Sequence, residues 1–328
     1  MSERTLRHPE RSEGSWDPSA ALRLQDDEET ALQQFRLENP RLFQKDDAKL
    51  FLHLGIVATL LLAGTIFVIA SPSIWVKIPV GAVNAFFWFS LVNVTIHHHH
   101  THHNAAKGGF AKKLLDVLYF LAVPDAPKRL GRYTRAHLNH HARPFHETDV
   151  DHYYGKTRYL SMRGFKKILY YLELTFVGAH VPGWEDDRYM NQAPLEAWNR
   201  ADYESVKIEE RKKALRLSLF QWSLFGASLY FLPAVAWGWA FPMLLVKNWA
   251  HFLGQFQHYD DRLTDASRTV WNRTKTYHFP GWLNYLAGGE ISGHFLHHLF
   301  PEIPYYNVEA ARRRLLENPE LSKLFVTY

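Results

Sequence analysis

The chain has 328 residues, of which 47% are hydrophobic and 22% are charged, with 38 Lys and Arg against 33 Asp and Glu. This composition excludes a disordered chain and a collagen-like one. The absence of cysteine excludes disulfides, thiolate nucleophiles and cysteine-bound clusters, so any metal needs histidine, carboxylate or carbonyl ligands. The 20 histidines far exceed ordinary usage, while the mean hydropathy of −0.29 is that of a soluble protein.

The N-terminal segment, residues 1–48, is polar. It has no apolar stretch that could serve as a cleavable signal, and residues 26–43 are predicted to form a surface helix. We therefore expect a cytoplasmic arm over residues 1–48, followed by a membrane domain over residues 49–328.

Two uncharged runs follow the arm. Residues 50–70 carry no charge, and at about 1.5 Å rise per residue such a helix crosses a ~30 Å hydrocarbon core. Residues 78–96 form a second run after the turn Ser71-Pro72-Ser73. The pattern predicts a hairpin of two membrane spans, over about 50–70 and 77–97.

A second hairpin is predicted near the middle of the chain. Residues 217–259 contain Lys247 as their only charge, and Pro233, Gly238 and Pro242 mark a reversal. The expected spans are about 215–234 and 238–258. Two further apolar stretches, 114–123 and 159–177, are too short or too charged to cross, and they are typical of helices that re-enter or lie on a membrane.

Lys and Arg gather in residues 1–49, 104–214 and 258–328 and are nearly absent from the two hairpin turns. By the positive-inside rule, both termini are expected to be cytoplasmic. The sequence thus predicts an all-α integral membrane protein with four transmembrane helices and a cytoplasmic helical cap, residues 98–214 and 259–328. The basic excess follows from this topology, and no nucleic-acid partner is expected.

The histidines form three groups, all on the predicted cytoplasmic side. The first group occupies the end of the second span, and the other two share the spelling HxxHH. On an α-helix, positions i, i+3 and i+4 lie within an arc of about 100°, so three imidazoles can point to one side. Two transition-metal ions suit so many imidazoles better than one. The groups are His97, His98, His99, His100, His102 and His103; His137, His140 and His141; and His294, His297 and His298.

Simpler interpretations explain less. An affinity tag would not be internal, and a histidine-rich buffer loop of a metal transporter would explain only the first group. A transporter also predicts spans lined by ionisable residues, whereas these spans are nearly bare. A membrane zinc hydrolase would need fewer histidines and a well-placed glutamate such as Glu290.

These motifs closely resemble those of the membrane fatty acid desaturase and hydroxylase superfamily. The resemblance covers roughly residues 50–320 and is most specific in GHFLHHLFPEIPYYNVEAARRRL at 293–315. It implies a four-helix membrane bundle whose cap holds a non-haem di-iron centre. Such a centre uses O₂ and two electrons to oxidise an unactivated C–H bond of a fatty acyl chain or lipid.

The resemblance also implies ligands. His98 fits the first position of the first motif, and either His102 or His103 fits the second. His251 matches the histidine that the family carries on its fourth span, and His258 is a lower-ranked alternative. The other implied ligands are His137, His140, His141, His294, His297 and His298.

Lys247 stands one turn before His251, inside the expected bundle, where an unpaired charge is costly and usually functional. The hypothesis is that it meets the carboxylate or polar headgroup of a substrate. The alternative is a cation that snorkels to the interface.

The resemblance leaves the product open, because a substrate radical can lose a second hydrogen, take up hydroxyl or lose CO₂. Desaturation is favoured as the commonest outcome in the family, ahead of hydroxylation and alkene-forming decarboxylation. The electrons must come from a separate ferredoxin, rubredoxin or cytochrome b5. Basic residues such as Lys128, Arg129, Arg132 and Arg135 are candidates for docking it.

Overall fold

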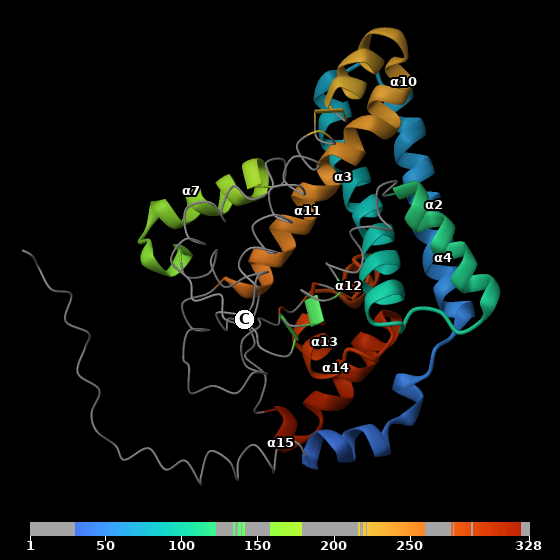
Figure 1. Cartoon of the computed structure of the whole chain (residues 1–328), viewed down its shortest axis with the longest axis vertical. Helices are drawn as coiled ribbons and strands as arrows, with labels where there is room; N and C mark the ends of the chain where they lie inside the picture. The colour runs from blue at the N-terminus through green and yellow to red at the C-terminus, as the bar shows by residue number, and fades with distance from the viewer. Residues whose placement is uncertain are drawn as a thin grey trace, which may run out of the picture.

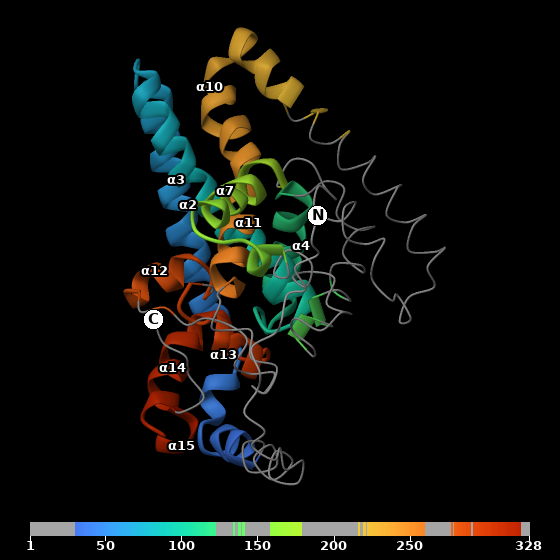
Figure 2. The ribbon, with the colours of Figure 1, turned by 90° about the vertical axis from the view of Figure 1, so that its left-hand side faces the viewer.

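The computed structural model describes residues 30–122, 134, 137–138, 140–141, 158–178, 216, 219–220, 222–259, 277, 279–289 and 291–322. Within these residues all the regular structure is helical. Long helices run roughly parallel as an upright bundle, and several short helices gather at its lower end (Figure 1). The view from the side shows the same arrangement (Figure 2).

The first two long helices form the expected hairpin. Helix α2 (Asp47–Ala70) begins where the Asp46 side chain accepts hydrogen bonds from the backbone of Ala48 and Lys49, at 2.9 and 3.4 Å. Helix α3 (Ile74–Asn93) runs without a break into the π-helix η2 (Val94–Thr101). Among the described residues, Asp47–Ala70 and Ile74–Thr101 are the two helices long and apolar enough to cross a membrane.

The third long element begins with α10 (Pro233–Val235) and a π-helical turn, η5 (Ala236–Ala240), and continues as α11 (Phe241–His258). Helix α11 packs closely on α3, because Gly81 leaves room for a ring: a Cβ there would lie 2.6 Å from Cδ1 of Phe241. The indole Nε1 of Trp249 donates to the Ala82 carbonyl, at 2.9 Å, and fixes the contact.

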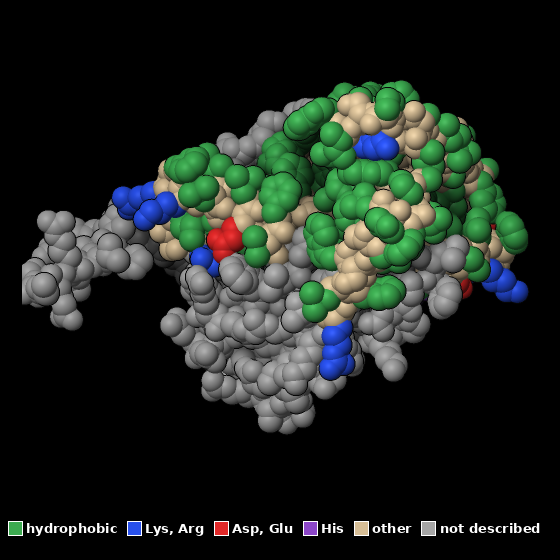
Figure 3. Space-filling view, turned by 90° about the horizontal axis from the view of Figure 1, so that it is seen from above, with side chains coloured by type: hydrophobic (Ala, Val, Ile, Leu, Met, Phe, Trp, Pro, Cys, Tyr) green, Lys and Arg blue, Asp and Glu red, His purple; other side chains and the backbone are tan. Residues whose placement is uncertain are grey.

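The upper end of the bundle is apolar. Seen from above, hydrophobic side chains crowd over the helix ends, with few charged groups among them (Figure 3). Exposed large hydrophobic residues would be costly in water, so this end resembles a surface covered by lipid. They include Phe67, Ile69, Ile74, Trp75, Tyr230, Phe231, Leu232 and Val235.

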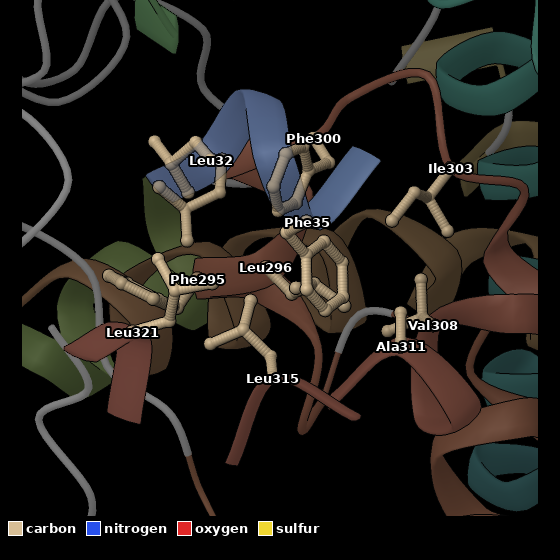
Figure 4. Packing of buried hydrophobic residues seen from close by; sticks show 11 residues of the cluster. Leu32, Phe35, Phe295, Leu296, Phe300, Ile303, Val308, Ala311, Leu315 and Leu321 are labelled. Carbon is tan, nitrogen blue, oxygen red and sulfur yellow. The ribbon is translucent and has the colours of Figure 1, made fainter. Parts of the chain in front are cut away.

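The lower end is built from the C-terminal helices α12 (Gly281–Leu286), α13 (His294–Leu299), η8 (Tyr305–Asn307), α14 (Val308–Leu316) and α15 (Pro319–Ser322). Helical residues 30–38 and the 3₁₀ turn η1 (Pro40–Phe43) pack against them. Figure 4 shows Leu32 and Phe35 of this N-terminal helix close to Phe295 and Phe300.

Two helices flank the bundle. Helix α4 (Gly109–Ala122) packs against η2 and α3, and α7 (Phe165–Glu173) continues as the π-helix η3 (Leu174–Gly178) beside α11. They correspond to the two apolar stretches that were too short or too charged to cross.

The structure therefore confirms only part of the predicted fold. The all-helical class is confirmed for the described residues, and α2 and α3 coincide with the first two expected spans. The other two expected spans correspond to helical residues 222–231 and to α10 through α11, which do not meet the same membrane criterion; the four-span topology stays a prediction. Outside the described residues lie Glu290, Lys128, Arg129, Arg132 and Arg135.

Candidate metal centre

Four histidines from three parts of the chain form a first cluster. His97 and His102 come from η2 and its end, His137 from the middle motif, and His297 from α13. Their candidate ligand nitrogens all lie within 4.8 Å of one another. The closest pair is His97 Nε2 and His297 Nε2, 2.6 Å apart.

The π-helix explains which histidines of the first group take part. In a π-helix the backbone bonds run from i to i+5, and here the His102 amide donates to the His97 carbonyl at 3.0 Å. Residues five apart therefore share a face, so His97 is paired with His102. An α-helix would instead have paired His98 with His102.

A second cluster contains four buried histidines: His140, His258, His294 and His298. His258 closes α11, and its Nε2 lies 2.7 Å from that of His294 and 3.2 Å from that of His140. His298 Nε2 lies 3.2 Å from His294 Nε2. The long helix α11 thus brings one ligand from the bundle to the motifs of the lower end.

His141 lies between the two clusters. Its Nε2 is 2.9 Å from that of His137 in the first cluster, and its ring stacks on His298 of the second, with ring centroids 4.1 Å apart. Each HxxHH motif is therefore divided: His137 and His297 face the first cluster, whereas His140, His294 and His298 face the second. The three imidazoles of each motif converge on this pair of clusters, as the spacing predicts, but they divide between the two.

The donor set fits transition-metal ions. Nine imidazoles converge with nitrogen atoms 2.6 to 3.2 Å apart in the closest pairs, which is close to the separation of ligands around one ion. All-nitrogen sites of neutral imidazole suit iron, copper, nickel or zinc. Two separate groups of four suit two ions.

Burial keeps three of these imidazoles in the neutral form that binds metal. The pKa of His297, His298 and His141 is lowered well below its usual 6.5, first by burial away from water and then by neighbouring histidines. At neutral pH a proton therefore does not compete for these nitrogens.

Hydrogen bonds between two asparagine side chains and the backbone hold the motifs in place. The Asn284 side-chain oxygen accepts from the amides of Ile291 and Ser292, at 3.1 and 2.9 Å, and so fixes the turn before α13. The Asn104 side chain donates to the Pro301 and Ile303 carbonyls, at 2.7 and 3.0 Å, and ties the first motif to the segment after α13.

Three of the expected ligands lie outside both clusters. His98 directs its Nε2 to the Gly288 carbonyl, at 2.8 Å, where Gly288 adopts a positive φ of 69° that glycine allows. The side chain of His103 is exposed, with its Nδ1 3.0 Å from the His99 carbonyl, and the side chain of His251 is also exposed. The remaining expected ligands, His102, His137, His140, His141, His294, His297 and His298, are all brought together.

The sequence motifs predict no role for His97 and favour His251 over His258. No motif distinguishes a π-helix from an α-helix, so the identity of the partner of His102 was not visible. Lys247 lies half-buried on α11, one turn before His251.

Comparison with protein-family models identifies the family of the chain. The model of the fatty acid desaturase family matches residues 72–328, well over half of the chain. The match includes the eight histidines of the two clusters and His141, and it begins after helix α2. No curated protein matches the chain.

Proposed function

Because the chain belongs to the fatty acid desaturase family, we propose that it uses O₂ to oxidise an unactivated C–H bond of a fatty acyl chain or lipid. The family implies an oxidoreductase with a fatty acyl or lipid substrate, and it is a family of membrane-bound proteins. The observation that carries the proposal is the pair of four-histidine clusters at one end of an apolar bundle.

The proposed ligands of two non-haem iron ions are the two clusters together with His141. Iron is favoured over zinc because activation of O₂ requires a metal that changes its oxidation state. When bound, the two ions would activate O₂, which is the oxidant for the C–H bond. The protein supplies ligand positions, neutral imidazoles and a site buried from water, which protects reactive species from side reactions. The proposed ligands are His97, His102, His137, His297, His140, His258, His294, His298 and His141.

The position of the acyl chain of the substrate relative to the clusters would decide the product. Desaturation is the favoured reaction, with hydroxylation and alkene-forming decarboxylation as alternatives, because the three outcomes share the first hydrogen abstraction. A shift of about 1 Å in the position of a reacting atom changes rates strongly, so side chains along the acyl path would select among them.

Lys247 is the proposed binding residue for the headgroup of the substrate. It lies on the same helix as His258, about three turns away. A carboxylate held by the Lys247 ammonium would leave the acyl chain to extend along α11 toward the clusters. The electrons are proposed to come from an external ferredoxin, rubredoxin or cytochrome b5, since the chain has no cysteine for a cluster of its own.

Mass spectrometry of whole-cell lipids and hydrocarbons tests the function. Cells that express the chain should accumulate products that have lost two hydrogen atoms, and cells that express His294→Ala, at equal protein level, should not. An added oxygen or a lost carboxyl carbon would assign hydroxylation or decarboxylation in place of desaturation. Identical profiles in both strains, with iron present in the purified protein, would contradict a lipid substrate.

A further inference from the structure

The π-helix η2 carries histidines on two faces. His97 and His102 face the first cluster, whereas His99 and His100, midway between them along the chain, face helix α4. There the Asp116 carboxylate oxygen Oδ1 lies 3.1 Å from His99 Nε2 and 3.5 Å from His100 Nε2. We call His99, His100 and Asp116 the α4 triad.

The separations within the triad fit a tetrahedral ion. Bonds of about 2.0 to 2.2 Å to a zinc-like ion, in a tetrahedral arrangement, place neighbouring ligand atoms about 3.3 Å apart. The two nitrogen-to-oxygen separations lie on either side of that value, and the two imidazole centroids are 4.6 Å apart.

Hydrogen bonding accounts for only part of the triad. His99 is within hydrogen-bond distance of Asp116, but the buried Nε2 of His100 has no hydrogen-bond partner among the described residues. A buried polar nitrogen without a partner costs about 1 to 3 kcal/mol. A metal ion between the three side chains would bind it.

The surroundings of the triad would hold a metal ion and still let it exchange with solvent. The side chains of His99 and His100 are only 11% and 19% exposed, and the His100 ring packs on Tyr119 with centroids 4.6 Å apart. Asp116 is 55% exposed, which leaves one side of the triad open to water. Because His99 and His100 are mostly buried and Asp116 is open to water, an ion can enter from the side of Asp116 without unfolding α4.

We propose that the α4 triad is a third metal site, for a borderline divalent ion of the zinc class. Two imidazoles and one carboxylate, without sulfur, match the donors that Zn²⁺ accepts, with water in the fourth position. The ion joins α4 to η2, the helix that bears His97 and ends just before His102. This role does not depend on the reaction at the two main clusters.

Zinc titration of the iron-loaded, full-length protein in detergent tests the site. Wild type should hold one zinc per chain after dialysis with its iron content unchanged, and Asp116→Asn should lose that zinc while it keeps its iron. Glu317→Gln removes another exposed carboxylate, at the C-terminal end of α14, and should behave as wild type. Wild type that retains no zinc, or Asp116→Asn that retains it, overturns the proposal.

X-ray absorption at the zinc edge of the wild-type protein gives a test that needs no variant. The proposal predicts two imidazole ligands and two oxygen ligands. A spectrum with four imidazoles would place the zinc in a main cluster and would refute the triad as a site. His100→Gln provides a second variant if Asp116→Asn does not fold, and it should reduce the imidazole count or abolish zinc binding.

Discussion

His258 and His251 lie two turns apart on α11, yet only His258 reaches a cluster. The family resemblance points to His251 because the residues around it match the family's pattern on the fourth span. Helix α11 continues beyond His251, however, and buries His258 at its end. The ligand assignment therefore depends on where α11 ends, which sequence patterns locate poorly.

The pair gives a matched test at the residue scale. His258→Ala should weaken iron binding by at least the roughly 10- to 100-fold that loss of an outer-shell partner costs. His251→Ala removes an exposed side chain of the same type and should leave iron content unchanged. Metal analysis after equal dialysis measures both, and the reverse order of the two variants would refute the assignment of His258.

Lys247 gives a second test at this scale. Lys247→Met keeps the length of the side chain but removes its charge, and KM for a free fatty acid should rise about tenfold or more, equivalent to about 1.4 kcal/mol of binding, with little change in kcat. Lys77→Met is the control, because Lys77 lies near the Trp237 ring at the apolar end. Unchanged KM in Lys247→Met would exclude a headgroup contact.

At the scale of elements, the N-terminal helix belongs to the unit that positions α13. Phe35 is 2% exposed and stacks on Phe300, just after α13, with centroids 5.3 Å apart. The Arg36 guanidinium also pairs with Glu302. The family match begins only at residue 72, so this support lies outside the matched region.

Two substitutions in that helix distinguish the loss of buried packing from the effect of any substitution in the helix. Phe35→Ala should lower the free energy of unfolding by about 3 to 5 kcal/mol, the usual cost of emptying a buried aromatic position. Leu37→Ala, in the same helix, changes a side chain that is 81% exposed and should have little effect. Denaturant unfolding in detergent measures the difference, and equal stability of the two variants would show that the helix does not support the fold.

The helices also show which parts of the fold and of the site the sequence predicts. The charge-free runs predicted α2 and α3 closely, since burial in lipid requires long apolar stretches. The three histidine groups were correctly expected to converge. The pairing of His97 with His102 was not predictable, because the sequence pattern does not distinguish the π-helix η2 from an α-helix.

At the scale of the whole molecule, the apolar end and the histidine clusters lie at opposite ends of the bundle. Both the N-terminal helix and α14 lie at the cluster end. The orientation of both termini toward the cytoplasm stays a prediction, which rests on the Lys and Arg gathered in residues 1–49, 104–214 and 258–328.

The natural absence of cysteine makes this orientation easy to measure. A single cysteine in Leu37→Cys should react with a membrane-impermeant thiol reagent only after the cells are opened. Ser73→Cys, in the turn between α2 and α3, should react in intact cells. The opposite labelling pattern would invert the topology, and labelling of both on one side would exclude a membrane-crossing hairpin.

The metal content of the purified full-length chain tests the central claim most directly. Two clusters of four imidazoles, bridged by His141, predict about two iron ions per chain when the protein is produced with ample iron and purified without chelator. Combined alanine substitution of His97 and His297 should remove about one of them and leave the second cluster loaded. Zinc as the sole tightly bound metal, or one iron that disappears completely in this double variant, would contradict a two-iron centre.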